Sequence, residues 1–206
     1  MQHATKNYEK ALDNYMEALK LQPDNTELLS QIGKLYHDMG RNQEAISMYD
    51  EIHTIKPNDE DANFQKAEIL KQSSKFSEAF VLYEAILASN PIHLGAMRGK
   101  ALVWCEINRN MADAALELIE RALLMAPTDY ETVLVKAHIL SQTGRATEAI
   151  ALYDVILAAT ENEQVRIRRA TAYIVIGEME KAVEEFDKIL RKSPDSVGGL
   201  SGMALA

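Results

Sequence analysis

The sequence is poor in residues that cross-link or interrupt a chain. Its 206 residues include one cysteine, five prolines and nine glycines. The single cysteine, Cys105, excludes an internal disulfide framework and a metal site built from several cysteines. Because helix breakers are few and Ala, Leu, Glu, Lys, Ile and Met recur, the composition favours helix.

Positive charge and long apolar runs are also scarce. The chain carries 22 basic and 31 acidic residues, a formal net charge of −9. Nucleic-acid binding needs a concentrated positive surface, so this balance argues against nucleic acid as a partner. No apolar run approaches the ~20 residues that span a bilayer, and residues 1–20 are too polar for a signal peptide. We therefore expect a soluble, cytoplasmic protein that binds neither nucleic acid nor membrane.

The sequence does contain an internal repeat, which is clearest in GRNQEAISMYDEIH at 40–53 and GRATEAIALYDVIL at 144–157. An alanine recurs at steps of 34, 34, 36, 34 and 33 residues, at Ala11, Ala45, Ala79, Ala115, Ala149 and Ala182. Larger apolar residues follow four residues later, and alanine or isoleucine follows seven residues later; these offsets lie on one face of a helix. Proline stands twelve residues after five of the six alanines, at Pro23, Pro57, Pro91, Pro127 and Pro194, and Glu161 takes that place once. Because proline ends helices, each period closes there.

A second helix is predicted upstream of each alanine. Its small residue is Gly33, Ala67, Ala101, Ala137 or Ala170, which lets two helices approach closely. The turn between the two helices carries Gly40, Gly144 and Gly177, suited to a left-handed cap, with Ser74 and Asn108 at the equivalent points. Polar residues after the prolines, such as Asn25, Asp59 and Asp129, can cap the next helix.

These columns resemble the tetratricopeptide repeat, a helix-turn-helix unit of 34 residues, and the resemblance covers essentially the whole chain. It implies an all-α fold, a right-handed α-solenoid of antiparallel helix pairs in one array over 1–206. By the family's phasing, 1–25 is a partial repeat, mainly its second helix, and 197–206 is a truncated first helix. The full repeats are 26–59, 60–93, 94–129, 130–162 and 163–196. Two readings of the ends stay open: a segment of a longer protein, or a native chain capped by its odd helices.

Several features depart from the repeat without indicating chemistry. Two extra residues near 108–111 predict a surface insertion rather than a partner-binding loop. The basic cluster Arg166, Arg168 and Arg169 could bind an anion, but Arg169 continues a column of Lys66, Lys100 and Lys136, which favours a recurrent interface residue. The glycine-rich stretch 197–202 lacks the residues of a phosphate loop. The histidines show no metal-ligand spacing, and no carboxylate pair is marked as catalytic, so we expect no cofactor, no metal and no enzymatic activity.

The resemblance implies that first helices line a concave groove that grips a peptide or helix of a partner protein. Carried over by position, the groove residues are Lys34, His37, Phe64, Gln65, Glu68, Arg98, Leu102, Cys105, Leu134, His138, Ile167, Arg168, Thr171 and Ile174. Cys105 is expected to be a buried or groove-lining thiol rather than a nucleophile. The subclass that clamps the C-terminal carboxylate of chaperone tails needs asparagine at two of these positions, and none occurs there. We therefore expect a different ligand, an amphipathic helix or an extended hydrophobic peptide.

The sequence thus predicts a non-enzymatic protein-interaction scaffold. Two alternatives remain: a regulatory or docking segment of a larger protein or enzyme, and a self-association module that forms homo-oligomers through the C-terminal end near Leu200 and Met203. A helical repeat that reads RNA base by base is disfavoured by the net negative charge.

Overall fold

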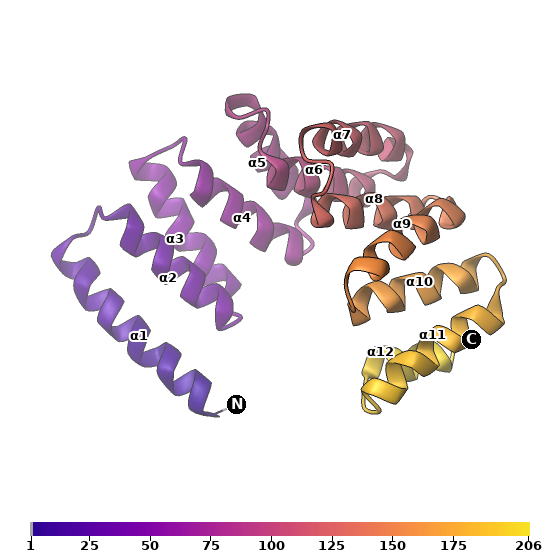
Figure 1. The fold of residues 1–206 in the computed structure, drawn as a ribbon. Helices are drawn as coiled ribbons and strands as arrows, with labels where there is room; N and C mark the ends of the chain where they lie inside the picture. Colours follow the sequence, from indigo (N-terminus) through magenta and orange to yellow (C-terminus); the bar gives the residue numbers. More distant parts are fainter. Residues whose placement is uncertain (1) are drawn as a thin grey trace. The chain divides into compact units, whose positions relative to one another are not determined.

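Helices account for all regular structure in the computed structural model, which describes residues 2–206 and the side chains of residues 7–206 (Figure 1). Within that range there are twelve α-helices, one short 3₁₀-helix and no strand. They are α1 (Gln2–Leu21), α2 (Thr26–Asp38), α3 (Asn42–Ile55), α4 (Glu60–Gln72), α5 (Phe76–Ser89), α6 (Leu94–Ile107), η1 (Arg109–Met111), α7 (Ala112–Met125), α8 (Tyr130–Gln142), α9 (Ala146–Ala159), α10 (Glu163–Val175), α11 (Met179–Lys192) and α12 (Val197–Met203). The predicted all-α fold of helix pairs is confirmed.

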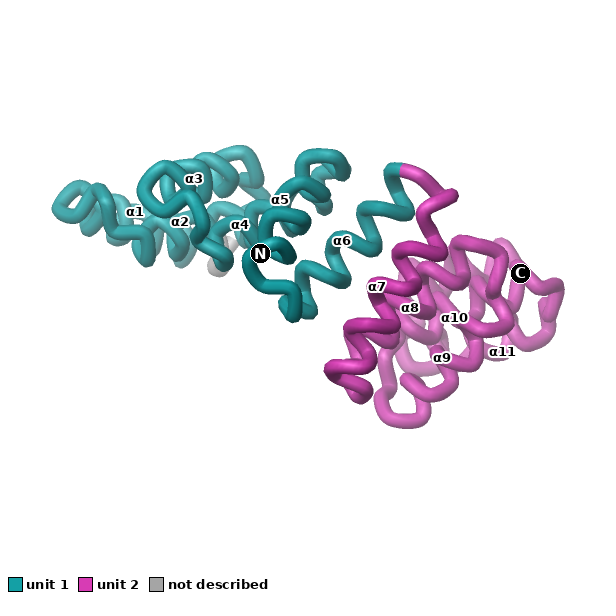
Figure 2. Tube along the Cα trace, turned by 90° about the horizontal axis from the view of Figure 1, so that it is seen from above, with its two compact units in different colours: residues 1–107 teal, residues 108–206 magenta. Residues whose placement is uncertain are grey.

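The chain forms two compact units, 1–107 and 108–206, shown in different colours in Figure 2. In unit 1 each helix from α1 to α6 packs on the next, and α4 also contacts α6. In unit 2 the same succession runs from α7 to α12, and α10 also contacts α12. The boundary lies inside the predicted repeat 94–129, whose two helices belong to different units. The division into one array of repeats stays a prediction.

Each helix begins and ends at residues that the sequence marks. The helices that precede a proline or Glu161 end two residues before it, as α3 does at Ile55 before Pro57. Side chains that accept hydrogen bonds from backbone N–H groups begin the next helices: Asn25, Asp59, Asp129, Asn162 and Ser196. His93 does the same for α6, because its Nδ1 accepts from the N–H of Ala96 at 3.0 Å. A histidine cap was not predicted.

The turns inside the helix pairs follow the predicted left-handed geometry wherever the pair has its standard length. Gly40, Gly144 and Gly177 have φ of +75°, +81° and +79°, and Ser74 has φ of +58° without being glycine. Asn108 differs, with an extended φ of −153°. The turn that carries the two extra residues contains the three-residue helix η1, and the Asn108 side chain accepts from the N–H of Asn110.

The repeated letters form the core of each unit. The alanines of the first column from Ala45 to Ala182 are fully buried, and so are the aromatic residues Tyr83 and Tyr153 that follow two of them. Small residues let these rings approach a neighbouring backbone. A Cβ on Gly202 of α12 would lie 2.1 Å from the Phe186 ring of α11, so only glycine fits there.

The short helix α12 therefore packs closely against α11. Met203 lies against the cluster around Phe186, whereas Leu200 is half-exposed. Of the two residues expected at a self-association surface, only Leu200 presents much apolar area to solvent.

Candidate functional site

The predicted groove residues lie on the first helices and fall into two sets, one in each unit. The unit 1 set is Lys34 and His37 on α2, Phe64, Gln65 and Glu68 on α4, and Arg98, Leu102 and Cys105 on α6. The unit 2 set is Leu134 and His138 on α8, and Ile167, Arg168, Thr171 and Ile174 on α10. We describe each set within its own unit.

In unit 1, Glu68 is engaged by its own chain. Its carboxylate accepts from the hydroxyl of Tyr83 at 2.5 Å and from Nζ of Lys71 at 2.7 and 2.8 Å. Burial, followed by the charge of Glu68, raises the pKa of Tyr83 strongly. Gly99 of α6 leaves room for this arrangement, since a Cβ there would lie 2.3 Å from Cζ of Tyr83. We call Tyr83, Glu68, Lys71 and Gly99 the tyrosine site of unit 1.

Two other predicted groove residues of unit 1 also serve internal packing. The half-buried Phe64 ring lies 4.9 Å from the His93 ring and 6.3 Å from the Tyr83 ring, measured between centroids. Cys105 is buried, and burial followed by the charge of Glu106 raises the pKa of its thiol. The structure therefore places the Cys105 thiol in the packed interior rather than on a surface open to a partner.

The exposed part of the unit 1 set is polar. Lys34 is exposed and lines a cavity of about 250 Å³ together with Glu27, Ser30, Lys56 and Gln65. Nδ1 of His37 lies 3.0 Å from Oδ1 of Asn42. The exposed surface that Lys34 and its neighbours form on these helices is therefore polar.

In unit 2, apolar and polar side chains share the first helices. Leu134, Ile167 and Ile174 are partly buried, whereas Arg168 and Thr171 are exposed. Ile167 reaches α12, because a Cβ on Gly198 would lie 2.5 Å from its Cδ1. A hydrogen bond joins α8 and α10, because Nη1 of Arg168 lies 2.8 Å from Nδ1 of His138. Since arginine can only donate, Nδ1 of His138 accepts.

The tyrosine site of unit 2 consists of Tyr153, His138, Ser141 and Arg168. Relative to Tyr153 these residues occupy the positions that Glu68, Lys71 and Gly99 occupy relative to Tyr83. The Tyr153 hydroxyl is buried without a hydrogen-bond partner. Burial, the largest effect, raises its pKa, while the nearby Ser141 hydroxyl and the charge of Arg168 lower it; the Ser141 hydroxyl itself donates to the carbonyl oxygen of His138 at 2.8 Å. Sequence reasoning treated Tyr153 only as a packing residue and missed its hydroxyl.

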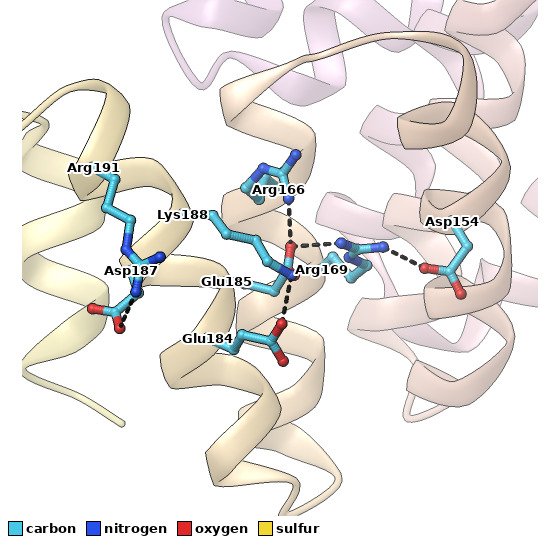
Figure 3. Close-up of polar contacts among 8 residues, drawn as sticks. All are labelled: Asp154, Arg166, Arg169, Glu184, Glu185, Asp187, Lys188 and Arg191. Carbon is cyan, nitrogen blue, oxygen red and sulfur yellow. Dashed lines mark hydrogen bonds and ion pairs between the residues drawn. The ribbon is translucent and has the colours of Figure 1, made fainter.

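Two of the three arginines in the basic cluster are engaged by a buried glutamate of α11 (Figure 3). Glu185, whose side chain is 5% exposed, accepts from Arg169 at 2.5 Å, from Lys188 at 2.9 Å and from Arg166 at 3.1 Å. Burial raises the pKa of Glu185, but the hydrogen bonds from Arg169 and Lys188 outweigh it and the pKa is lowered. Arg166 and Arg169 therefore serve this network, and Arg168 is the cluster's exposed member.

Arg169 also continues the predicted column of long cationic side chains. Lys66 pairs with Asp50 at 2.5 Å, Lys100 with Glu84 at 2.9 Å, Lys136 with Glu120 at 3.1 Å and Arg169 with Asp154 at 2.5 Å. Each pair joins a first helix to the second helix that precedes it in the chain. The structure confirms the prediction that this column of cationic residues lies at the interface between neighbouring helices.

The described residues hold no group of three or more His, Cys, Asp or Glu side chains able to bind a metal ion. Among the described helices, none has the length and apolar character required to cross a membrane.

Comparisons with known proteins agree on one family. A family model described as TPR repeat matches residues 2–40, and models described as tetratricopeptide repeat match residues 28–62, 64–130, 107–170 and 164–196. Human anaphase-promoting complex subunit 7 is 24% identical over 199 residues, which cover 97% of this chain and 35% of that protein. The chain spans between about a fifth and a third of the length of the curated relatives it matches.

Solved structures share the fold. A tetratricopeptide repeat protein from Parabacteroides merdae has a TM-score of 0.79 at 20% identity, covering 99% of this chain and 79% of that one. YrrB, described as a TPR protein with an unusual peptide-binding site, has a TM-score of 0.61 at 16% identity, covering 91% and 96%. At such identities the likeness shows the fold alone.

Proposed function

Because the chain belongs to the tetratricopeptide repeat family, we propose that it is a non-enzymatic scaffold that binds a peptide or helix of a partner protein on its first helices. The fold supports protein–protein interaction in general. Stacked helices present their surface already formed, so little conformational entropy is lost when a peptide is captured.

The observation that carries the proposal is the surface of α8 and α10. Leu134, Ile167 and Ile174 are incompletely buried there, and the exposed Arg168 and Thr171 stand beside them. Aliphatic area next to hydrogen-bonding groups is the chemistry of a peptide-binding surface. It suits an amphipathic helix or an extended hydrophobic peptide. A peptide-binding relative of the same fold, YrrB, is consistent with this use.

The chaperone-tail clamp is not part of the proposal. Its two asparagine positions carry Lys34, Glu68, Leu102, His138 and Thr171 in one column, and Gln31, Gln65, Gly99, Val135 and Arg168 in the other. In unit 1, Glu68 is already held by Tyr83 and Lys71. A carboxylate arriving at that point would meet a carboxylate.

The test compares two aliphatic positions on neighbouring helices, the partly buried Leu134 of α8 and the exposed Val155 of α9. L134D places a charge on the first helix α8, and V155D places the same charge on the second helix α9, where Val155 is 66% exposed. Ile167 is unsuitable, because its contact with α12 would confuse loss of binding with loss of packing. The probe is a set of peptides selected from a random library on the wild-type chain, with affinities measured by fluorescence anisotropy.

We expect L134D to weaken the selected peptides at least about tenfold, because it introduces a charge into an apolar contact. V155D is expected to bind as the wild type does, and circular dichroism checks that both variants are folded. Equal affinities for L134D and the wild type contradict the groove proposal, and so does an equal loss in both variants.

A docking role inside a larger protein is the second candidate. It is favoured by the length of the curated relatives, of which the chain covers between about a fifth and a third. Detection of the native protein by an antibody raised against this chain, on a denaturing gel, measures whether its mass exceeds 23.0 kDa. A native mass equal to that value contradicts this candidate.

Self-association through Leu200 is tested by sedimentation. The L200E variant removes the half-exposed apolar side chain of α12. A dimer in the wild type that is lost in L200E supports the self-association role, and a wild-type monomer at high concentration contradicts it.

A further inference from the structure

The two tyrosine sites share a buried tyrosine but differ in the residues around its hydroxyl. His138, Ser141 and Arg168 stand in unit 2 where Glu68, Lys71 and Gly99 stand in unit 1. In each, a fully buried tyrosine of a second helix points its hydroxyl towards residues of the neighbouring first helices. In unit 1 a cation and the tyrosine hydroxyl converge on the carboxylate of Glu68. In unit 2 a cation and the tyrosine hydroxyl are present, but His138 stands at the position of Glu68.

The unit 2 site therefore contains hydrogen-bond donors, on Tyr153 and Arg168, that have no acceptor within the site. The hydroxyl of Tyr153 has no hydrogen-bond partner although it is buried, which is a costly state for a polar group. Arg168 donates to the His138 ring, and among the described residues it forms no ion pair. A guanidinium has five N–H donors, so one contact leaves most of them available.

We propose that the tyrosine site of unit 2 binds a carboxylate of the partner peptide, which takes the place that Glu68 fills in unit 1. One carboxylate oxygen accepts from the Tyr153 hydroxyl and the other from Arg168, whose side chain leaves its contact with His138 to admit the ligand. The inference rests on the proposed peptide-binding function, and it names the chemistry of the residue recognised at that surface.

The surroundings restrict the ligand further. Leu134 lies one helical turn before His138, and Ile167 and Ile174 flank Arg168 on α10. The ligand therefore carries aliphatic residues on both sides of its acid. The net charge of −9 repels a run of acidic residues, so a single carboxylate is favoured over an acidic stretch.

Reaching the hydroxyl requires a side chain to move. The Tyr153 oxygen is buried, whereas Arg168 is exposed and, within the tyrosine site, is held by its hydrogen bond to His138. Rotation of a long exposed side chain is a small and fast change. The ligand carboxylate then occupies the position that the Arg168 side chain has when no ligand is bound.

The first experiment needs no ligand. The H138E variant places a carboxylate where Glu68 stands in unit 1, and H138Q is its uncharged match. We measure the folding equilibrium of both by urea denaturation of the full chain, with Tyr153 intact and in the Y153F background. Coupling between Glu at position 138 and the Tyr153 hydroxyl of about tenfold in the folding equilibrium constant is expected. No coupling overturns the proposal that the site accepts a carboxylate.

The second experiment uses two random peptide libraries, one with amidated and one with free C-termini, selected on the full chain. An acidic side chain as the source gives Asp or Glu enriched at one position of the amidated binders. A terminal carboxylate as the source gives binders only in the free library. The affinity of the enriched peptides is expected to fall about tenfold or more in R168M, since a charge-assisted hydrogen bond is lost.

The control is K10M, which removes an exposed cation from α1, outside the first helices that carry the groove residues, and is expected to leave the affinity unchanged. Binders without a carboxylate preference, or with equal affinity for R168M and the wild type, overturn the carboxylate site while leaving the peptide scaffold intact. A complete absence of binders overturns the proposed function itself, and the mutant cycle still decides whether the site accepts a carboxylate.

Discussion

Replacing Glu185 by glutamine removes one negative charge from a buried network and leaves its geometry in place. The Glu185 carboxylate accepts hydrogen bonds from Arg169, Lys188 and Arg166 at 2.5, 2.9 and 3.1 Å (Figure 3). The Glu185 side chain is 5% exposed. The amide oxygen of glutamine still accepts hydrogen bonds, but the NH₂ group that replaces the second oxygen can only donate. The cations would then face each other without the charge that compensates them.

The size of the effect follows from how each cation can respond. Breaking a fully buried ion pair costs about 3–5 kcal/mol. Here Arg166 and Lys188 have side chains 22% and 44% exposed, so water can solvate them, and Arg169 keeps Asp154. We therefore expect E185Q to lower the free energy of unfolding by about 2–3 kcal/mol at pH 7.

The effect must depend on pH with a definite sign. The pKa of Glu185 is lowered from its ordinary value of 4.5 in the folded chain. The carboxylate therefore contributes its full stability above pH 4.5, and that contribution is lost as the pH falls through the lowered folded pKa. The difference between the wild type and E185Q should shrink under acid conditions.

Urea denaturation followed by circular dichroism, at pH 7 and at steps below 4.5, measures both quantities. The control is E184Q in the adjacent position, where a 66% exposed glutamate contacts only Lys188 among the described pairs, and we expect a loss of at most about 0.5 kcal/mol. The reasoning is refuted if E185Q and E184Q destabilise equally, or if the loss in E185Q stays constant down to acid pH.

Three further substitutions test the tyrosine sites and their packing by the same denaturation assay. Tyr83→Phe removes the hydroxyl that Glu68 accepts and should lower the free energy of unfolding by about 1.5 kcal/mol, whereas Tyr153→Phe removes an unpartnered hydroxyl and should be neutral or stabilising; a larger loss at Tyr153 than at Tyr83 contradicts this. Gly99→Ala would ordinarily stabilise a helix by about 1 kcal/mol. Its Cβ would lie 2.3 Å from the Tyr83 ring, so we expect a loss of about 2 kcal/mol instead, and a gain would show that the ring moves freely.

The fold was predictable because the sequence states the same local physics many times. Proline and glycine act on the backbone at their own position, so Pro57 and Gly144 mark a helix end and a turn without reference to the rest of the chain. Ser74 shows the limit of that logic: its φ of +58° is imposed by the turn, although serine does not prefer it. Asn108 lost the turn geometry because two residues were inserted beside it.

The candidate site was less predictable because its chemistry depends on residues that meet across helices. Spacing placed Arg169 at an interface, yet Glu185 was not identified as the group that also holds it. Tyr83 and Tyr153 read alike as packing residues, and only the contacts of their hydroxyls separate them. A signal was available in the residues fifteen positions earlier, Glu68 and His138, but its meaning requires knowing that this offset joins the two helices of a pair.

The column of ion pairs bears on how such a chain can change its length. Three pairs join residues 16 positions apart and the fourth joins residues 15 apart. The two residues inserted near 108–111 lie outside every such interval, so they leave each link at its usual spacing. The step from Ala149 to Ala182 is 33 residues, one fewer than the standard 34, and the missing residue falls inside the last interval. The cation of that pair is arginine in place of lysine, and arginine has a longer reach and two further donors. A helix pair gained or lost as a whole would again bring an acid to the cation that follows it, which makes the pair the natural unit of insertion and deletion in this protein.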